Sequence, residues 1–292
     1  MTTPLLSIVI LSHNRREALL RTLGQMVCHD RGRNDAGISR EVIVVDNASK
    51  DGSPEAVREN FPDVQLVALH SNEAIQGFNI GAARARGVFL LILDDDAWVE
   101  PDVLCDALEY LKEHNEVGGV ALLPKHPATG ICEWPFATRA SDEFPVMGCG
   151  NLVRGSAWRQ VQGYEQAFFL YRNDVDLALK LLSAGWGIAF RPEWVVWHDS
   201  PAAARKSERW LHLATRNWVW LVRRHEQNPL VMLVAFALHL ATALRAAGLD
   251  VDRMNCVMNG FIDGWREPVP KRPAVCTSSG ALRKLLRLRL GL

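Results

Sequence analysis

Three consecutive aspartates, Asp94, Asp95 and Asp96, directly follow the apolar run of residues 89–93. Neighbouring carboxylates raise one another's pKa unless a cation neutralises them, so a divalent metal ion is the simplest chemical reason for this group. Carboxylate oxygens suit Mg²⁺ or Mn²⁺, and these ions take their remaining ligands from water and substrate phosphates. The alternative is a solvated acidic turn that caps a helix beginning near Pro101. The position after a buried strand favours the metal site.

That strand belongs to an alternating series of strands and helices. Apolar runs typical of strands covered on both faces occupy residues 5–11, 42–45, 64–69 and 88–93. Helices are expected between them, at residues 15–26, 54–60 and 80–86. The alternation predicts a parallel, doubly wound sheet, whose ligands bind at the carboxyl ends of the strands. Those ends are polar here, at residues 12–14, 46–49, 70–72 and 94–96.

The usual phosphate-binding loops do not follow these strands. There is no G-x-G-x-x-G after the first strand and no G-x-x-x-x-G-K-[ST] segment. We therefore expect a phosphate ligand to be held through a metal ion.

The composition excludes several classes of protein. Lys plus Arg equals Asp plus Glu, at 33 each, so no nucleic-acid partner is indicated. The six cysteines form no C-x-x-C pair and no zinc-site spacing, which is typical of free thiols in a reducing cytoplasm. No basic segment precedes the first apolar run, so a secretory signal peptide is not predicted.

Six segments between residues 6 and 224 form a pattern: SIVILSHNR, VIVVDNASKDGS, SNEAIQGFNIGAARARG, LLILDDDAWVEPD, VQGYEQAFFLYRNDVDLALKL and WVVWHDS. Together they resemble family 2 glycosyltransferases with the GT-A fold. The resemblance implies an α/β fold with a Rossmann-like, mostly parallel central sheet flanked by helices. It also implies inverting, metal-dependent transfer of a sugar from a UDP- or dTDP-sugar donor.

The FFLYRNDVDL segment is similar to that of bacterial enzymes that use L-rhamnose or galactofuranose donors. The resemblance thus implies a glycan or lipid-linked acceptor in surface polysaccharide, lipopolysaccharide or cell-wall assembly.

The resemblance also assigns donor-binding residues. Asp46 would contact the nucleobase, because a carboxylate can accept the imide N–H of uracil or thymine. The metal ligands, for Mn²⁺ or Mg²⁺, would be Asp94, Asp96 and His198. The other nucleotide contacts would be Ser12, Asn14, Asn72, Gly77, Asn79, Asp94 and Asp95. Structural alternatives stay open: Asp46 could cap a turn, Gly77 could be a turn glycine, and His198 could serve packing.

The catalytic segment of the family corresponds to residues 168–181. Asp174 is the predicted general base, which takes the proton of the acceptor hydroxyl, and Asp176 is the fallback. Asn173 stands where the family usually has Glu. A helix-capping role for Asn173 and Asp174 is compatible with catalysis. A basic run, Arg205, Lys206 and Arg209, could clamp the phosphates or could be a solvated surface.

Two regions are expected along the chain: a GT-A domain at residues 1–224 and a helical extension at 225–292 that ends in a basic amphipathic tail. Residues 1–100 would form the nucleotide-binding half of the domain, and 101–224 the acceptor and catalytic half. The apolar helix at 229–247 approaches the length of a bilayer span, but His239, Thr242 and Arg245 argue against spanning. The extension could dock on the inner face of the cytoplasmic membrane, or pack on the domain or on a second copy of the chain.

Two other functions fit parts of the pattern. A D-x-D phosphatase would place its aspartates on the first strand, whereas here they follow the fourth. A non-catalytic sugar-nucleotide-binding scaffold is suggested by Asn173 alone.

Overall fold

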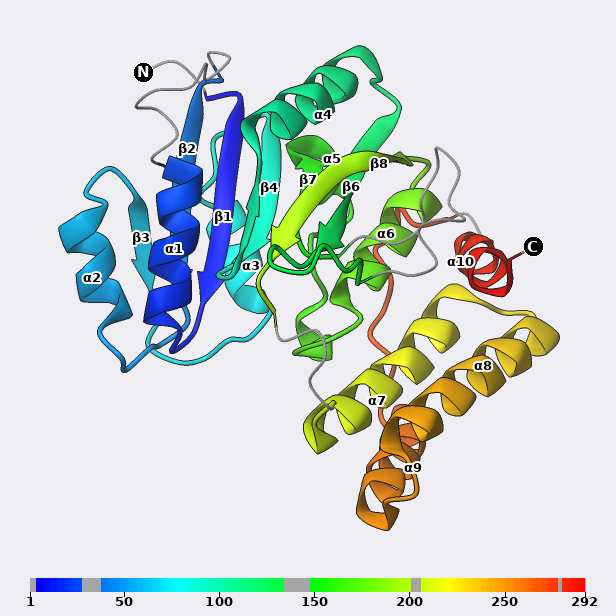
Figure 1. Cartoon of the computed structure of the whole chain (residues 1–292). Helices are drawn as coiled ribbons and strands as arrows, with labels where there is room; N and C mark the ends of the chain where they lie inside the picture. The colour runs from blue at the N-terminus through cyan, green and yellow to red at the C-terminus, as the bar shows by residue number, and fades with distance from the viewer. Residues whose placement is uncertain (1–3, 28–37, 134–147, 201–205, 278–279, 292) are drawn as a thin grey trace.

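The computed structural model describes residues 4–27, 38–133, 148–200, 206–277 and 280–291, and Figure 1 shows the arrangement. An eight-stranded mixed sheet runs through the molecule in the order β3-β2-β1-β4-β7-β6-β8-β5. The strands are β1 Leu6–Ser12, β2 Arg40–Asp46, β3 Gln65–Ala68, β4 Phe89–Asp94, β5 Ala97–Val99, β6 Val117–Lys125, β7 Asn151–Arg154 and β8 Gly187–His198.

The first four strands are parallel, as predicted. β7 runs antiparallel to β4 and β6, and β5 runs antiparallel to β8, so the whole sheet is mixed but mostly parallel in its nucleotide-binding half. The predicted strands at 42–45 and 88–93 lie within β2 and β4 with small differences at their ends.

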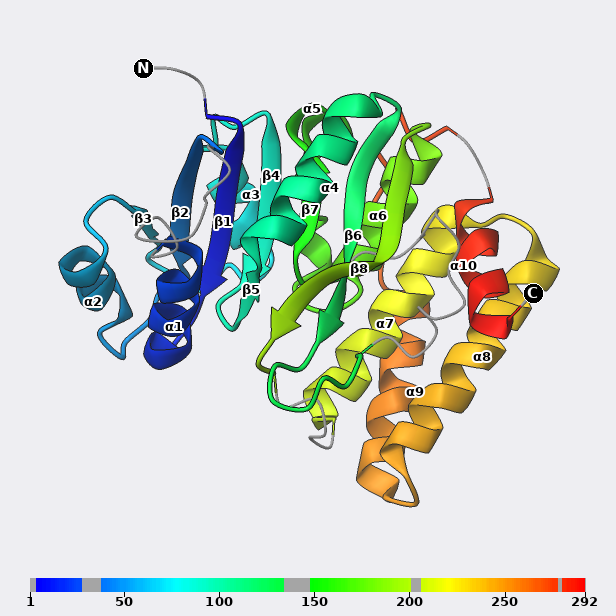
Figure 2. The ribbon, with the colours of Figure 1, turned by 45° about the horizontal axis from the view of Figure 1, so that its top comes forward.

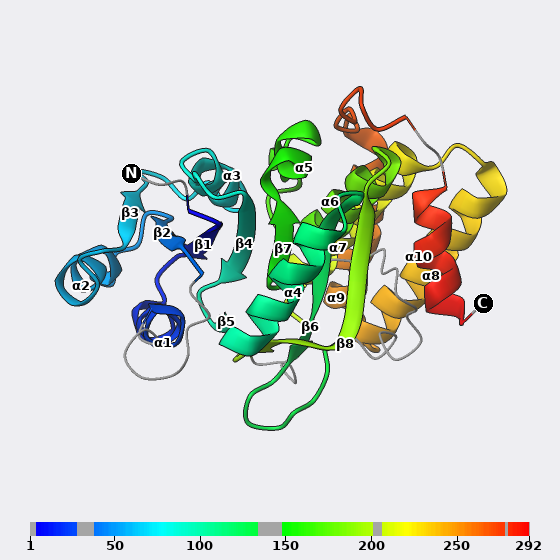
Figure 3. The same ribbon diagram turned by 90° about the horizontal axis from the view of Figure 1, so that it is seen from above.

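Helices cover both faces of the sheet because successive strand residues point to opposite sides. Ile8, Ile10 and Val44 belong to a core cluster with residues of α1 (Arg16–Val27) and α4 (Pro101–Glu113). Val9 and Val45 face the other side, which carries α3, α5 and α6 (Figure 3). The remaining helices of the domain are α2 Ser53–Asn60, α3 Gln76–Ala82, α5 Gly155–Gln160, the short 3₁₀ helix Gln166–Phe168 and α6 Asn173–Ser183.

Four helices follow the last strand: α7 Glu208–His225, α8 Pro229–Ala247, α9 Val251–Arg266 and α10 Ala281–Leu290. In Figures 1 and 2, α7, α8 and α9 lie side by side beneath the sheet, and α10 returns toward α6. Ser207, Asn228 and Asp250 cap the first three through side-chain oxygens that accept backbone N–H groups. The predicted boundary at residue 224 falls at the end of α7.

The apolar face of the basic tail is packed inside the protein. Leu282, Leu285 and Leu286 of α10 are buried in the same core cluster as α6, so packing accounts for these leucines. α8 is different: Leu230 and Leu233 are 72% and 64% exposed. By length and composition alone α8, with a mean hydropathy of 1.9, is the one helix among the described residues that could cross a membrane.

Candidate active site

The polar strand ends meet at one edge of the sheet. Strand register places Ser12 beside Asp46 and Leu11 beside Asp94. Asn151 begins β7 at the same edge because β7 runs antiparallel to β4, and His198 ends β8 opposite Ala97. Residues from five strands are therefore brought together, as parallel α/β sheets require of their ligand sites.

The three aspartates point in different directions. The side chain of Asp94 is half exposed, whereas those of Asp95 and Asp96 are buried. Asp95 accepts a hydrogen bond from the hydroxyl of Ser12 at 2.8 Å, and Arg15 lies 3.4 Å from its other oxygen. Burial raises the pKa of Asp95 to about 7.

Arg15 also donates to Oδ2 of Asp96 at 2.7 Å. This guanidinium and the nearby His198 keep the pKa of Asp96 below its usual value, although burial alone would raise it. Asp96 is therefore ionised. The pKa of Asp94 is raised to about 6, first by the partial loss of hydration at this half-exposed position and then by the nearby Asp96 and Asp174 carboxylates.

His198 lies between three carboxylates. Its Nδ1 is 2.8 Å from Glu133, and its Nε2 is 3.2 Å from Oδ1 of Asp96 and 3.9 Å from Asp94. Burial alone would lower the pKa of His198, but Asp96 and Glu133 raise it to about 10. Ser200 donates to the same oxygen of Glu133 and so helps to fix the imidazole.

The residues around His198 have the chemistry of a site for a divalent cation. Ligand atoms of Asp94, Cys149 and His198 lie within 4.8 Å of one another, and the buried Oδ1 of Asp96 lies 3.2 Å from Nε2 of His198. A carboxylate on the far nitrogen of a histidine is the usual arrangement behind a metal-binding imidazole. Burial raises the pKa of the Cys149 thiol well above its ordinary value, so this sulfur stays protonated and is a poor ligand for a hard cation. Asp94, Asp96 and His198 would hold the ion.

Asp46 has a free oxygen in the position predicted for the nucleobase contact. Its Oδ2 accepts the backbone N–H of Ser49 at 3.0 Å, which is the turn-capping role. Its Oδ1 is buried and has no hydrogen-bond partner among the residues that the structure describes. A buried acceptor without a donor is costly, so this oxygen suits a ligand N–H. Nearby, Asn14 and Asn72 are exposed and accept backbone N–H groups of Lys50 and Ala74.

Four residues predicted to contact the nucleotide are engaged inside the protein instead. Ser12 and Asp95 are buried and bound to one another. Gly77 is no turn glycine: it lies in α3, where an added Cβ would be 2.3 Å from Cδ1 of Leu11. Asn79 donates to the carbonyl of Tyr164 and accepts its N–H, so both ends of the amide are occupied. These contacts hold the site in position, and contact of the four residues with the nucleotide stays a prediction.

Asp174 lies at the same edge, on the first turn of α6. Its Oδ1 accepts hydrogen bonds from the hydroxyl of Tyr164 at 2.7 Å and from Nδ2 of Asn151 at 2.9 Å. No side chain among the described residues donates to Oδ2. Burial raises the pKa of Asp174, which makes its carboxylate a stronger base.

The segment before Asp174 is strained. Phe169, Tyr171 and Arg172 have positive φ angles of 61°, 68° and 66°. Non-glycine residues adopt such angles at a cost and cluster at functional sites. The side-chain amide of Asn217 on α7 donates to the carbonyls of residues 168, 170 and 171, at 2.7 to 2.9 Å. α7 thus fixes the segment that carries the base.

The structure does not support Asp176 as the fallback base. Its side chain is fully buried and lies 2.8 Å from His225, 3.6 Å from Lys180 and 3.6 Å from Arg224. The charges of Lys180 and Arg224 and the hydrogen bond with His225 hold the pKa of Asp176 far below its usual value against the effect of burial. A carboxylate so enclosed cannot reach an acceptor hydroxyl.

The structure describes two of the three residues in the basic run, and these two lie in different places. Arg205 lies outside the described residues. The ammonium of Lys206 lies 5.4 Å from the ring of Trp210. Its charge adds to the hydrogen bonds from His198 and Ser200 in lowering the pKa of Glu133, so Lys206 lies near Glu133. Arg209 instead lies 5.2 Å from the ring of Phe169.

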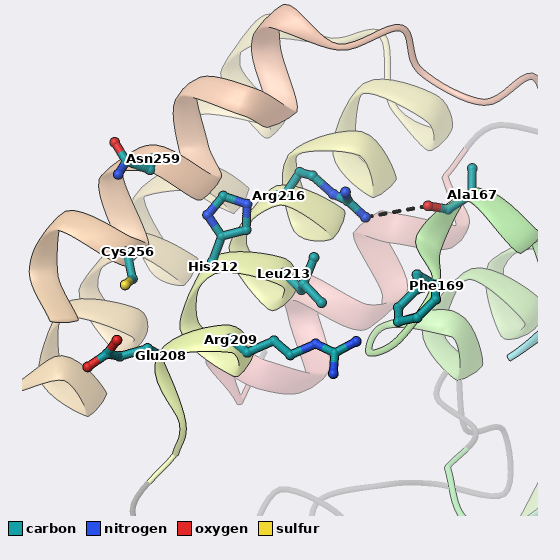
Figure 4. Close-up of a pocket in the computed structure, with 9 residues that line it drawn as sticks. All are labelled: Ala167, Phe169, Glu208, Arg209, His212, Leu213, Arg216, Cys256 and Asn259. Carbon is teal, nitrogen blue, oxygen red and sulfur yellow. Dashed lines mark hydrogen bonds between the residues drawn. The ribbon is translucent and has the colours of Figure 1, made fainter. Parts of the chain in front are cut away.

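Figure 4 shows Arg209 in a separate pocket of about 550 Å³ between α7, α9 and the segment before the base. Arg216, on the same wall, donates to the carbonyl of Ala167. None of the three consecutive aspartates lines this pocket.

Three residues of the site were not predicted: Arg15, Glu133 and Tyr164. Arg15 and Tyr164 lie inside matching segments, HNR and VQGY, so their position was a usable signal. Glu133 lies in the irregular region between residues 133 and 153, where the periodicity of the sequence is weak. Asn151 belongs to the segment 148–151, which the family resemblance places beside the acceptor pocket.

Comparison with known proteins finds a glycosyltransferase family and relatives named for sugar transfer or polysaccharide synthesis. The family model described as Glycosyl transferase family 2 matches residues 7–135. An N-acetylglucosaminyl-diphospho-decaprenol L-rhamnosyltransferase of Mycobacterium tuberculosis is 25% identical over 231 residues, which cover 63% of this chain and 75% of the relative. The succinoglycan biosynthesis protein ExoO of Rhizobium meliloti is 32% identical over 36% of this chain and 29% of its own length.

Solved structures share the fold. The mannosyltransferase PcManGT of Pyrobaculum calidifontis, in complex with GDP-Man and Mn²⁺, matches 99% of this chain and 81% of its own with a TM-score of 0.60 and 20% identity. TarS of S. aureus, in complex with UDP-GlcNAc, matches 98% of this chain and 87% of its own with a TM-score of 0.59 and 14% identity. The architecture is that of GT-A glycosyltransferases.

Proposed function

We propose that the chain is a family 2 glycosyltransferase that moves a sugar from a UDP- or dTDP-sugar to a hydroxyl of a lipid-linked or glycan acceptor, with inversion at the anomeric carbon. The observation that carries the proposal is the pairing of Asp174, which has one free oxygen, with the nearby cluster of Asp94, Asp96 and His198.

Donor recognition would begin with the nucleobase. The free Oδ1 of Asp46 can accept the imide N–H of a pyrimidine, which lies between two carbonyls on the ring edge. Guanine presents a different edge, with two adjacent donors. We therefore favour a uridine or thymidine diphosphate sugar, with rhamnose or galactofuranose as the expected sugars.

The leaving group is a nucleoside diphosphate, so its growing charge must be stabilised. Mn²⁺ or Mg²⁺ held by Asp94, Asp96 and His198 would neutralise that charge when bound. Glu133 fixes the imidazole and Arg15 fixes Asp96, so the ligand set is positioned before the donor arrives. Lys206 supplies a further positive charge at the same side.

Asp174 would act on the acceptor. Tyr164 and Asn151 occupy Oδ1, which leaves Oδ2 to accept the proton of the attacking hydroxyl. The acceptor oxygen bonds to the anomeric carbon as the bond from that carbon to the diphosphate oxygen breaks on the opposite face. The proton ends on Asp174 and the electron pair on the departing diphosphate, in one inverting displacement.

A relative and α8 support a proposal about the acceptor and the location. The mycobacterial relative is named for a diphospho-decaprenol substrate, and the exposed leucines of α8 could contact a lipid surface. We propose action in surface polysaccharide assembly at the inner face of the cytoplasmic membrane. Association with a second copy of the chain remains a prediction.

Donor binding gives the first test. Thermal stabilisation by UDP, dTDP and GDP, with and without Mn²⁺, should be largest for a pyrimidine nucleotide with the metal, because specific ligands stabilise only the folded state. Asp46→Ala should lose the base preference. Asp174→Asn should retain donor binding and lose transfer, and Asp96→Ala should lose the metal effect. Full transfer activity in both Asp174→Asn and Asp96→Ala would refute the assignment.

A further inference from the structure

Cys149 lies beside the carboxylate and the imidazole of the candidate metal site. It directly precedes Gly150, whose φ is 77°, and a Cβ added to Gly150 would lie 2.8 Å from Cγ2 of Val196 on β8. A glycine at this position permits both the positive φ and the close approach to β8. The approach brings Cys149 next to the end of β8, where His198 lies.

The three ligand atoms are close enough to share one ion. Atoms of Asp94, Cys149 and His198 lie within 4.8 Å of one another, and Nε2 of His198 is 3.9 Å from Oδ2 of Asp94. Ligands of a tetrahedral zinc ion are about 3.3–3.6 Å apart, given bonds of about 2.0–2.3 Å, so a modest movement of the side chains would enclose the ion. Solvent reaches the site, because the Asp94 side chain is 48% exposed and Cys149 is a partly exposed free cysteine.

The support that a metal-binding histidine needs is already in place. Oε1 of Glu133 lies 2.8 Å from Nδ1 of His198, and Ser200 donates to the same oxygen. A carboxylate on the far nitrogen fixes the ring and strengthens it as a ligand. Nε2 lies 3.2 Å from Oδ1 of Asp96, and a bound ion would replace the proton between these atoms.

The sulfur changes which ion the site prefers. Carboxylates suit Mg²⁺ and Mn²⁺, whereas imidazole and especially thiolate ligands suit Zn²⁺. The protonated thiol of Cys149 is a poor ligand for a hard cation, but zinc deprotonates a thiol that it coordinates. The proton passes to solvent as the Zn–S bond forms, so the step needs no further reactant.

The two kinds of ion leave different room for a diphosphate. Mg²⁺ prefers octahedral coordination, so three protein ligands leave several positions for phosphate oxygens and water. Zinc is usually four-coordinate, so Asp94, Cys149 and His198 would leave only about one position. An ion held in this way cannot bind the donor diphosphate through two oxygens.

We propose that Asp94, Cys149 and His198 form a zinc site that overlaps the proposed site for Mn²⁺ or Mg²⁺, and that a thiophilic cation bound there blocks donor binding. This inference rests on the proposed function, in which a hard cation carries the diphosphate. Asp94 and His198 belong to both ligand sets, so only one ion binds at a time. Cys149 distinguishes the two sets.

Cobalt reports sulfur coordination directly, because a thiolate bound to Co²⁺ gives a charge-transfer absorption band. The whole wild-type chain titrated with Co²⁺ should show this band, and Cys149→Ser should lose it. Cys256→Ser is the matched control and should keep the band, since Cys256 is also a partly exposed free cysteine but lies on α9. A band of undiminished strength in Cys149→Ser would overturn the proposal.

Metal affinities test the preference itself. Zn²⁺ binds more tightly than Mn²⁺ at most sites, so the informative quantity is the change caused by Cys149→Ser. Competition with a chelator should show Zn²⁺ binding weakened by at least the roughly tenfold to hundredfold that loss of a supporting residue costs. The Mn²⁺ affinity should stay at the wild-type value. Equal weakening of both ions would mean that Cys149 is purely structural.

The wild-type chain offers a test without any substitution. Zn²⁺ should protect Cys149 from alkylation by N-ethylmaleimide, whereas Mn²⁺ should not. Cys256 should react to the same extent with either ion and without metal, and mass spectrometry of peptides measures both thiols. If Cys149 is alkylated equally with and without Zn²⁺, its sulfur is not a zinc ligand.

Donor binding separates this inference from the proposed function. With Mn²⁺ present, added Zn²⁺ should abolish the thermal stabilisation of the wild type by UDP or dTDP, and Cys149→Ser should need about tenfold more Zn²⁺ or above for the same effect. Stabilisation that Zn²⁺ does not reverse would refute the block. Failure of every nucleotide to stabilise the chain with Mn²⁺ would instead count against the proposed function, and the cobalt result would stand.

Discussion

Removing the hydroxyl of Tyr164 should change the pH at which the enzyme works. The hydroxyl donates one of the two hydrogen bonds that Oδ1 of Asp174 accepts, at 2.7 Å, and Asn151 supplies the other at 2.9 Å. Burial raises the pKa of Tyr164 well above its ordinary value, so it stays protonated and donates throughout the working range. Tyr164→Phe removes this bond and leaves the ring and its packing in place.

The size of the pKa shift follows from the negative charge of Asp174, which accepts the hydrogen bond. A hydrogen bond to a charged group contributes about 1.5–3 kcal/mol. Since one pKa unit corresponds to about 1.4 kcal/mol, losing a bond that favours the ionised carboxylate should raise the pKa of Asp174 by about one to two units. The base must be ionised to act, so the acidic limb of the kcat/KM profile should move to higher pH by that amount.

The assay is transfer at saturating metal across the pH range, with donor and acceptor varied separately. Above the shifted limb, activity should recover to within about tenfold of the wild type, because the base is still present and intrinsically stronger. Tyr110→Phe is the matched control, since the Tyr110 hydroxyl makes no hydrogen bond with a described residue. A uniform loss at every pH with an unmoved limb would refute the reasoning.

Three further predictions concern the scaffold around the site. Gly81→Ala should destabilise the fold by about 1–3 kcal/mol, because the new Cβ would lie 2.4 Å from Cγ1 of Val9 and 2.9 Å from Cγ2 of Val45, two buried valines with stiff side chains, and chemical denaturation would measure this loss. Gly24→Ala, where nothing lies within 4 Å, should be neutral or stabilising; equal losses in both variants would contradict the packing argument. His239 faces the hydroxyl of Thr215, and burial, with the charges of Arg172 and Arg289, lowers its pKa to about 2, so it is neutral in the folded protein. The unfolded chain gains a proton there below about pH 6.5, so stability should fall by up to about 1.4 kcal/mol per pH unit toward pH 5, and His239→Gln should flatten the slope seen in melting curves; an unchanged slope would contradict this. Asn217→Ala should lower kcat more than donor affinity because it releases the strained segment before the base, and a KM effect alone would count against this role.

The sequence was most informative where local rules decide the outcome. Solid apolar runs predicted the four parallel strands, and because parallel strands end at one edge, Asp46 and Asp94 could be placed together without coordinates. His198 lies a hundred residues later, and only its place at the end of a predicted strand connected it with them. The structure brings its Nε2 to 3.2 Å from Asp96.

Predictions were weaker where the role of a residue depends on distant partners. Asn79 and Ser12 lie in the correct segments, yet what each side chain does depends on Tyr164 and Asp95, more than 80 residues away. A pattern shows that a residue lies at the rim of the site. It does not show whether the side chain faces the ligand or holds a neighbour that does.

Oδ1 of Asp46 is buried at the edge of the sheet and has no hydrogen-bond partner among the described residues. It incurs a cost that the protein alone does not offset, and a nucleobase N–H would offset it. Oδ1 of Asp96 differs, because Nε2 of His198 lies 3.2 Å away and the charge of His198 helps to keep the pKa of Asp96 low. A bound cation would take over that compensating role. Other unpaired atoms, such as those of Asp176 and His225, belong to a closed ion cluster and face charged neighbours. Because the nucleobase and the metal would be held by different atoms, each should stabilise the fold at a separate place.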